Sequence, residues 1–406
     1  MKRLSTVTFL LLFLLLNTCS RNSTIEQTMR ERANKLAQKF ILIDTHIDVP
    51  ERLHSRWEDI SQKTEEGNFD YPRAIKGGLN APFMSIYIPA SYQQTGGAKA
   101  LADTLIDMVN KFASDWTDKF IIATSPADVI NQFSTTRISL CMGMENGAGL
   151  EGNLGNLKYF YNRGIRYITL THSKNNKIGD SSYDEEEKWH GLSPFGVKVV
   201  KEMNRLGIMV DVSHITDSTF FDVMEISEAP VIASHSSCRY FTPGWQRNMS
   251  DEMIKTLAEH GGVIQINFGS SFLSGKIQEK RSKIWKAIDS LLAERNIKRN
   301  SPEAENIIKN YWKEHKSGYA DVKDVADHID HVAELAGIDY VGIGSDFDGV
   351  GDSLPTGLKD VSQYPNLIYE LLKRGYSDED IEKICGKNLL RVWKQVEKTA
   401  KRLRSE

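Results

Sequence analysis

FILIDTHID, residues 40–48, is an apolar run of β-strand length that ends in two side chains able to bind a metal, His46 and Asp48. Seven further apolar runs of similar length follow it along the chain, and amphipathic helical stretches separate most of them. Strands that alternate with helices form a parallel sheet, and eight such units predict an α/β fold of the (β/α)8, TIM-barrel type. The eight predicted strands are Phe40–Thr45, Pro82–Ile88, Ile138–Met144, Tyr167–Thr171, Ile208–Val212, Val231–Ser234, Gly262–Asn267 and Tyr340–Ser345. The helices expected between them include Ala98–Ser114, Gly155–Arg163, Pro194–Leu206, Asp217–Ile226 and Asp251–His260.

Side chains that bind metals recur at the carboxyl ends of these strands, where barrel enzymes place their catalytic groups. Three imidazoles and two carboxylates suit zinc or a similar metal, but a catalytic zinc usually has only three protein ligands. The set therefore indicates two metals that share a carboxylate, and hence metal-activated hydrolysis. The five expected ligands are His46, Asp48, Glu145, His214 and His235.

Three more residues at the same edge are candidates for work on a substrate. His172 follows the fourth strand and is interpreted as a donor to a substrate carbonyl, with a sixth metal ligand as the alternative. Arg247 could hold a carboxylate, and its alternative is an ordinary surface arginine. Asp346 ends the eighth strand and fits a general acid and base. Asp348 ranks second for that role, as a loop former before a glycine.

The amino terminus has the pattern of a secretory signal. Lys2 and Arg3 precede a short apolar run, and Leu-Asn-Thr-Cys then resembles a bacterial lipobox that makes Cys19 the first mature residue. A plain cleaved signal is the alternative. We therefore expect a signal at 1–19, a polar tether at 20–36 and a single domain at 37–406, exported from a bacterial cell and lipid-anchored in the outer membrane or periplasm.

Composition narrows the remaining choices. Fifty-one basic against 54 acidic residues give a net charge of −3, which favours neither nucleic acid nor an anionic membrane surface. Cys141, Cys238 and Cys385 form no disulfide framework and are interpreted as buried thiols, with one bridge at most; for Cys141 and Cys238 the alternative is an extra metal ligand. Two insertions, 173–193 and 273–318, are expected to form walls or a lid over the barrel mouth, and residues 364–402 to form two closing helices.

Together these motifs resemble the membrane (renal) dipeptidase family of zinc peptidases, whose fold is a metal-dependent-hydrolase barrel. The resemblance extends from about residue 38 to residue 395, and the chain opens with the family's His-x-Asp in place of the His-x-His of most related barrels. It is carried by Asp44–Pro50, Met142–Gly147, Tyr167–Ser173, Asp211–His214, Ser234–Ser237, Arg247-Asn248 and Val341–Val350.

The resemblance implies two zinc ions in each subunit. His46, Asp48 and Glu145 would hold one, and Glu145, His214 and His235 the other, while His172, Arg247 and Asp346 would contact a dipeptide. Animal members carry a cysteine after the fourth-strand histidine and a tyrosine after the seventh strand; this chain has Ser173 and, at the nearest position, Phe272. Homodimers are common in the family.

The expected activity is hydrolysis of free L,L- and L,D-dipeptides by a hydroxide that bridges the two zinc ions. Another barrel hydrolase, such as a lactonase, phosphotriesterase or deaminase, is a first alternative, although it would usually need His-x-His and a modified lysine. A binding lipoprotein with an inactive barrel is a second alternative, although an inactive site would usually have lost ligands. No partner is expected besides the dipeptide, a lipid anchor in the membrane and a second subunit.

Overall fold

A parallel barrel forms the centre of the computed structural model, which describes residues 25–299 and 301–406. Its strands pair in the order β1-β2-β4-β5-β6-β7-β8-β9. The barrel closes where the backbone N–H of Asp346 donates to the His46 carbonyl (3.0 Å) and that of Asp48 donates to the Phe347 carbonyl (2.9 Å). The predicted (β/α)8 fold is confirmed. The strands are β1 (Leu42–Ile47), β2 (Leu79–Tyr87), β4 (Ile138–Glu145), β5 (Ile165–Thr169), β6 (Met209–Asp211), β7 (Ile232–Ser236), β8 (Val263–Ile266) and β9 (Val341–Ile343).

Two details of the strands differ from the prediction. β3 (Phe120–Ile122) was not expected; it pairs with β4 off the path of the barrel and is only three residues long, too short for a periodic signal. β1 begins and ends two residues later than expected, so that His46 lies within the strand. Asp48 has φ −89° and ψ 31° and precedes helix α2 (Val49–Ser55). The backbone is therefore no longer extended at Asp48, and its side chain reaches the barrel mouth from the start of a helix.

The helices around the barrel begin where the sequence predicts, because a hydroxyl side chain caps several of them. The Ser193, Thr216 and Ser250 side chains accept hydrogen bonds from the first turns of α8, α9 and α10. α14 (Val322–Leu335) was not predicted, although Asp321 and Asp324 give it a capping box. The predicted helices are α5 (Ala98–Asp115), α7 (Gly155–Asn162), α8 (Pro194–Leu206), α9 (Asp217–Ile226) and α10 (Asp251–Glu259).

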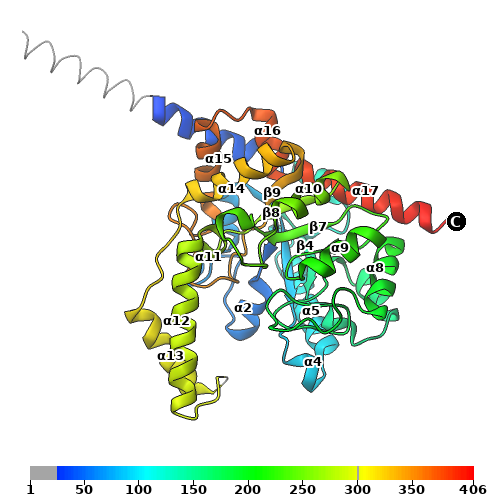
Figure 1. Ribbon diagram of the computed structural model, residues 1–406. Coiled ribbons are helices and arrows are strands. Elements are labelled where there is room, and N and C mark those ends of the chain that lie inside the picture. Colours follow the sequence, from blue (N-terminus) through cyan, green and yellow to red (C-terminus); the bar gives the residue numbers. More distant parts are fainter. Residues whose placement is uncertain (1–24, 300) are drawn as a thin grey trace, which may run out of the picture.

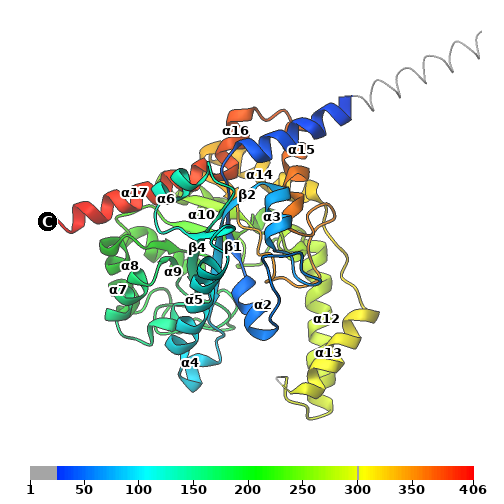
Figure 2. The ribbon, with the colours of Figure 1, turned by 180° about the vertical axis from the view of Figure 1, so that it is seen from behind.

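Helix α17 (Asn388–Leu403) covers the amino end of the barrel, opposite α2 (Figures 1 and 2). Its Trp393 is fully buried, and its ring centroid lies 5.4 Å from that of Phe83 on β2. α17 continues from α16 (Asp378–Glu382) through a π-helical turn, so that with α15 (Tyr364–Lys373) it forms two closing helices. Inward-facing strand residues and α17 make one apolar cluster, which includes Ile43, Phe83, Cys141, Tyr167, Met209, Ile232, Val263, Leu389 and Trp393.

The amino-terminal boundary of the domain differs from the expectation. Residues 25–39 are helical, and Ala33 and Leu36 are buried in the core. The described part of the expected tether, residues 25–36, is thus a packed helix, because apolar residues recur on one face of it. The predicted signal and Cys19 lie outside the described residues. Among those described, no helix is long and apolar enough to cross a membrane.

The second insertion folds into a helical arm. α12 (Gly275–Glu294) and α13 (Pro302–Glu314) lie side by side and extend from the barrel past α2 (Figures 1 and 2). Ile284, Ile288 and Leu292 of α12 pack on Ala304 of α13 in a small core of their own. The first insertion is organised by the Asp180 carboxylate, which accepts hydrogen bonds from the backbone N–H groups of residues 188, 189 and 191.

Candidate metal centre and active site

A pocket of about 1010 Å³ opens at the carboxyl ends of the strands. Ser173, Lys174 and Tyr183 from the first insertion line it, as do residues of α12 from the second. Both insertions therefore form walls of the pocket, as expected. Five of the eight predicted site residues also line it, namely Asp48, Glu145, His172, His214 and Asp346. His46, His235 and Arg247 lie just beneath and contact these residues.

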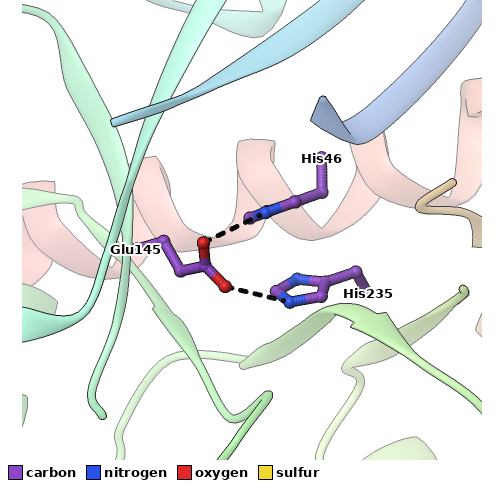
Figure 3. Close-up of side chains that lie close together, drawn as sticks. All are labelled: His46, Glu145 and His235. Atoms are coloured by element: carbon purple, nitrogen blue, oxygen red, sulfur yellow. Dashed lines mark ion pairs between the residues drawn. The ribbon is translucent and has the colours of Figure 1, made fainter. Parts of the chain in front are cut away.

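Glu145, the last residue of β4, lies at the centre of the expected ligands. Its Oε2 is 3.4 Å from Nε2 of His46, while its Oε1 is 3.1 Å from Nε2 of His214 and 3.3 Å from Nε2 of His235. Figure 3 shows His46 and His235 facing different oxygens of the carboxylate. Burial alone would raise the pKa of Glu145, but the charges of His172 and His46, together with the adjoining His214 and His235 side chains, hold it well below its usual range. A carboxylate in this position can bridge two cations.

The tautomer of His46 is set by a tyrosine inside the barrel. Nδ1 of His46 lies 2.8 Å from the Tyr167 hydroxyl, and that hydroxyl donates its own hydrogen to the Thr45 carbonyl (3.0 Å). The hydroxyl must therefore accept from Nδ1–H, which makes Nε2 the nitrogen available to a metal. Burial alone would lower the pKa of His46, but the charges of Tyr167, Asp48 and Glu145 raise it well above the usual range, so a metal would displace a proton from Nε2. This buried Nε2 has no hydrogen-bond partner among the described residues and lies 3.5 Å from Oδ2 of Asp48. An imidazole oriented in this way is ready to bind a metal.

A second relay orients His235. Oγ of Ser234 lies 2.7 Å from Nδ1 of His235 and donates to the Asp211 carboxylate (2.6 Å). The serine oxygen therefore accepts from Nδ1–H, and Nε2 of His235 keeps its lone pair on the side of Glu145. Asp211 also accepts from the backbone N–H groups of Ser213 and Ser234, so it fixes β6 and β7 relative to one another.

The His214 and His235 side chains meet at their Nε2 atoms, which are 2.9 Å apart. His235 lies on β7, and His214 follows the neighbouring strand β6. Burial lowers the pKa of both imidazoles well below the usual range, and nearby cations, first Arg247 for His214 and His46 for His235, lower it further. Both rings are consequently neutral, which is the form that binds metals.

Two carboxylates, those of Asp48 and Asp346, share the opposite side of the centre. Burial, and then the charge of Asp48, raise the pKa of Asp346 to about 7. Its Oδ2 accepts from the Asn267 side chain (2.7 Å). Gly349 packs against both carboxylates: a Cβ on it would lie 2.2 Å from an oxygen of each. A glycine at this position lets the two acidic groups approach, and near neutral pH Asp346 can both gain and lose a proton.

His172 lies beside the expected ligands but slightly farther from Glu145 than the other three histidines do. Its Nε2 is 3.5 Å from Oε1 of Glu145, its ring packs edge-on against Tyr87, and a fifth of its side chain is exposed to the pocket. Burial lowers the pKa of His172. It can form a group with Glu145 and His214 that would accept a metal, so the alternative of a sixth ligand stays open beside that of a substrate donor.

Arg247 is buried, with only 2% of its surface exposed, so the alternative of a surface arginine is wrong. Its guanidinium donates to Ser236 Oγ (2.9 Å) and to the His235 carbonyl (2.8 Å), and Nη2 lies 3.0 Å from Nε2 of His214. Nε has no partner among the described residues. The ring of Phe272 lies 5.1 Å from the guanidinium carbon and lines the pocket. This residue therefore supports the arginine through its ring face, without a hydroxyl.

Other sequence candidates lie elsewhere. Asp348 accepts from Arg52 (3.1 Å) and from the backbone N–H of Asn68 (2.6 Å), which makes it a loop former. The three described cysteines are buried, form no disulfide and belong to no group of potential metal ligands in the described chain. Sequence reasoning gave no role to Tyr167, Asp211 and Ser234, which orient the histidines. A tyrosine in an aliphatic strand opposite Gly143 was an available signal, since a Cβ on Gly143 would strike the Tyr167 ring.

The donor set fits a metal. Nε2 of His46 and Nε2 of His235 are turned toward Glu145, while a hydroxyl holds Nδ1 of each ring. Nε2 of His46 has no hydrogen-bond partner among the described residues, and carboxylate oxygens lie around it. Three groups of described residues could each hold an ion, and Glu145 belongs to two of them. The groups are His46-Glu145-His235, Glu145-His172-His214 and His46-Asp48-Asp346.

Comparison with known proteins assigns the class. The sequence profile of the membrane dipeptidase family (peptidase family M19) matches residues 30–406. An uncharacterized dipeptidase of Schizosaccharomyces pombe is 32% identical over 388 residues, which cover 91% of this chain and 84% of that protein. The chain therefore belongs to the membrane dipeptidase family. It is a metal-dependent dipeptidase, which decides against the two alternative functions.

Solved structures agree on the fold. The probable dipeptidase PvdM from Pseudomonas aeruginosa superposes with a TM-score of 0.80 at 28% identity, over 92% of this chain and 100% of that one. A metallopeptidase from Rhodobacter sphaeroides, solved with a phosphinate mimic of L-Ala-D-Ala, gives a TM-score of 0.72 at 24% identity, over 88% and 99%.

Proposed function

We propose that this dipeptidase hydrolyses free dipeptides, with a second residue of either hand, by means of two zinc ions that share Glu145. The observation that carries this proposal is the division of the Glu145 carboxylate, with Oε2 turned to His46 and Oε1 to His214 and His235. A single ion would need only one of these sets. Nitrogen and oxygen donors in this ratio suit zinc.

These contacts support an assignment of the ligands to two sets. His46, Asp48 and Glu145 would hold one ion, and Glu145, His214 and His235 the other. When bound, the two ions would supply an activated water and would polarise the carbonyl of the scissile bond. The chain's contribution is to fix the ligands: Tyr167 and Ser234 hold the imidazoles in the required tautomers.

Asp346 is the proton carrier of the proposed reaction. It is buried beside Asp48, and its pKa of about 7 allows it to take a proton from the nucleophile and to give it to the leaving amine. The Asn267 amide holds its other oxygen and so fixes the direction of the carboxylate. His172 faces the pocket next to Glu145, where its side chain can donate to the oxygen of the carbonyl under attack.

Arg247 is the group that would recognise a free carboxyl terminus. It is buried next to His214 and His235, keeps an unpartnered Nε, and rests on Phe272. A guanidinium pairs well with a carboxylate in such surroundings. A fixed carboxylate at this distance from the metal ligands restricts the enzyme to short peptides.

The test is an assay of the zinc-loaded protein, without its first 24 residues, on Ala-Ala of both L,L and L,D forms. N-acetylated, C-amidated and tripeptide versions serve as controls. We expect chelator-sensitive cleavage of the free dipeptides and two zinc ions in each chain by elemental analysis. Full activity with one ion would overturn the binuclear proposal, and cleavage of the tripeptide at an equal rate would overturn the restriction to dipeptides.

The role of Arg247 has a separate test. In the Arg247→Ala variant, kcat/KM for Ala-Ala should fall by about 10²-fold, because a buried charge pair is lost. The amidated peptide should be cleaved equally poorly by both proteins. If the variant still discriminated between the free and the amidated peptide as the parent does, another residue would recognise the carboxylate.

We also propose that the protein is exported, is lipidated at Cys19 and forms homodimers. The proposal rests on the basic and apolar amino terminus followed by Cys19, and on the dimers common in the family. Labelled fatty acid incorporated into the parent protein and absent from Cys19→Ser would support lipidation; equal label in both would refute it. Light scattering of the soluble domain measures its oligomeric state.

A further inference from the structure

Among the charged side chains that line the pocket outside the proposed machinery, two differ from the rest. Lys174 is paired with Asp184 at 2.7 Å and Arg299 with Asp289 at 2.5 Å, so each of these cations is neutralised by the protein. Glu51 and Arg281 also line the pocket and are only half-buried. Within the described residues neither has an ion pair or a hydrogen bond. These two opposite charges are therefore available to a ligand.

Glu51 belongs to the side of the pocket formed by β1, β2 and β4. It lies in the first turn of α2, directly after β1. It is close enough to Glu145 and Tyr87 for their charges to interact, and Tyr87 is the last residue of β2. This places the free carboxylate on the side of the metal centre opposite Arg247, which is anchored on β7.

Arg281 belongs to the other side. It lies on α12, where its guanidinium carbon is 5.0 Å from the ring of Trp312. Burial raises the pKa of Tyr183, and both Arg247 and Arg281 oppose that rise, so the phenol lies within electrostatic reach of both guanidinium groups. The Tyr183 ring also packs edge-on against Trp245, which contacts Phe272. A continuous aromatic wall thus connects Arg281 with Arg247.

The direction in which a dipeptide binds determines which of its side chains meets Glu51 and which meets Arg281. If Arg247 holds the free carboxylate, the second residue lies along the wall that leads to Arg281, and the first residue lies toward α2 and Glu51. We propose that the enzyme selects dipeptides with a basic side chain on the first residue, paired with Glu51, and an acidic side chain on the second, paired with Arg281. This inference rests on the proposed function, because Arg247 sets the direction.

The experiment compares kcat/KM of the zinc-loaded enzyme for Ala-Ala, Lys-Ala, Ala-Asp, Lys-Asp and the reversed peptide Asp-Lys. We expect Lys-Ala and Ala-Asp each to exceed Ala-Ala by about tenfold, the size of one partly desolvated charge pair. Lys-Asp should be the best substrate and Asp-Lys the worst, and the spread should narrow at high salt.

Two variants, each of which removes one charge and keeps a polar side chain, separate the two contributions. Glu51→Gln should bring the ratio of Lys-Ala to Ala-Ala close to one and leave the ratio of Ala-Asp to Ala-Ala unchanged. Arg281→Gln should do the converse. Arg299→Gln, whose cation is already paired with Asp289, is the matched control and should change neither ratio. Circular dichroism and thermal melting verify that each variant is folded.

The outcomes distinguish a failure of this inference from a failure of the proposed function on which it rests. If the parent enzyme cleaves Lys-Ala no faster than Ala-Ala, or if a preference for Lys-Ala persists in Glu51→Gln, the assignment of Glu51 is overturned. The same two outcomes for Ala-Asp and Arg281→Gln would overturn the assignment of Arg281. Equal losses on all peptides in Glu51→Gln would also overturn it, because they would show that Glu51 binds the common α-ammonium. Failure to cleave any dipeptide, Ala-Ala included, would instead contradict the proposed function.

Discussion

The amino end of the barrel is closed by α17 and filled with apolar side chains, whereas its carboxyl end holds a cluster of ionisable groups nearly as buried. Trp393 and Phe83 represent the first end, and Glu145 with its histidines the second. Burial of apolar surface stabilises a fold, while burial of charge opposes folding unless partners compensate. The amino end of the barrel therefore mainly contributes stability, and the carboxyl end mainly carries the chemistry. Substitutions at the amino end should lower stability, and substitutions at the carboxyl end should lower activity.

The largest effect is expected at Glu145. Glu145→Gln removes the charge that both proposed ligand sets face. Because these ligands act as one unit, kcat/KM should fall by about 10⁴-fold or more. Elemental analysis should show less than the parent's metal content, with the thermal midpoint of the metal-free protein preserved. Glu225→Gln, at an exposed position on α9, is the control. If Glu145→Gln retained its full metal content, Glu145 would not be needed to hold the metal, and the chemical role assigned to the carboxyl end would be wrong.

Asp346→Asn should cost about 10²- to 10⁴-fold in kcat/KM, because it removes the proposed proton carrier. The amide can still bond Asn267, so folding should be retained. Metal content measured beside activity distinguishes a proton-transfer role from a ligand role. A variant that loses its metal together with its activity would show that Asp346 is a ligand, as its grouping with His46 and Asp48 allows.

At the opposite end, Trp393→Ala should lower the free energy of unfolding by about 3–5 kcal/mol, since it leaves a cavity beside Phe83. Urea titration of the metal-free protein measures the change. Activity per folded molecule at low temperature should stay near that of the parent. Lys394→Ala, exposed on the same helix, should be neutral. A loss of activity without a loss of stability would show that the ends are coupled.

Tyr167→Phe has the smallest expected effect and tests the residue that links the ends. The Tyr167 ring packs with Phe83 at 5.5 Å, and its hydroxyl accepts from His46. Loss of the hydroxyl should cost about 1 kcal/mol in unfolding free energy and weaken metal binding by about 10- to 100-fold. Competition with a zinc chelator measures the affinity. Unchanged affinity would mean that His46 needs no partner on Nδ1.

The sequence predicted the barrel well because its strands are apolar runs followed by helices with hydroxyl caps, as in α8 and α9. The candidate ligands were recognisable since polar side chains end those runs. β3 was missed because three residues carry no period. The supporting residues Tyr167 and Asp211 were also missed, because their roles depend on contacts between strands distant in sequence, such as Tyr167 with His46. The charges at Glu51 and Arg281 became informative only when the fold placed both in one pocket.

The shared carboxylate of Glu145 has a thermodynamic consequence. In the proposed two-ion centre, its two oxygens face different ligand sets, so the first ion to bind would neutralise a charge that the second also needs and would repel that second ion. The second ion should therefore bind more weakly than the first, and by linkage each should weaken the other by the same factor. Enzyme short of metal should then consist mostly of molecules with one set occupied, so that limiting zinc lowers the activity of each molecule rather than the number of loaded molecules.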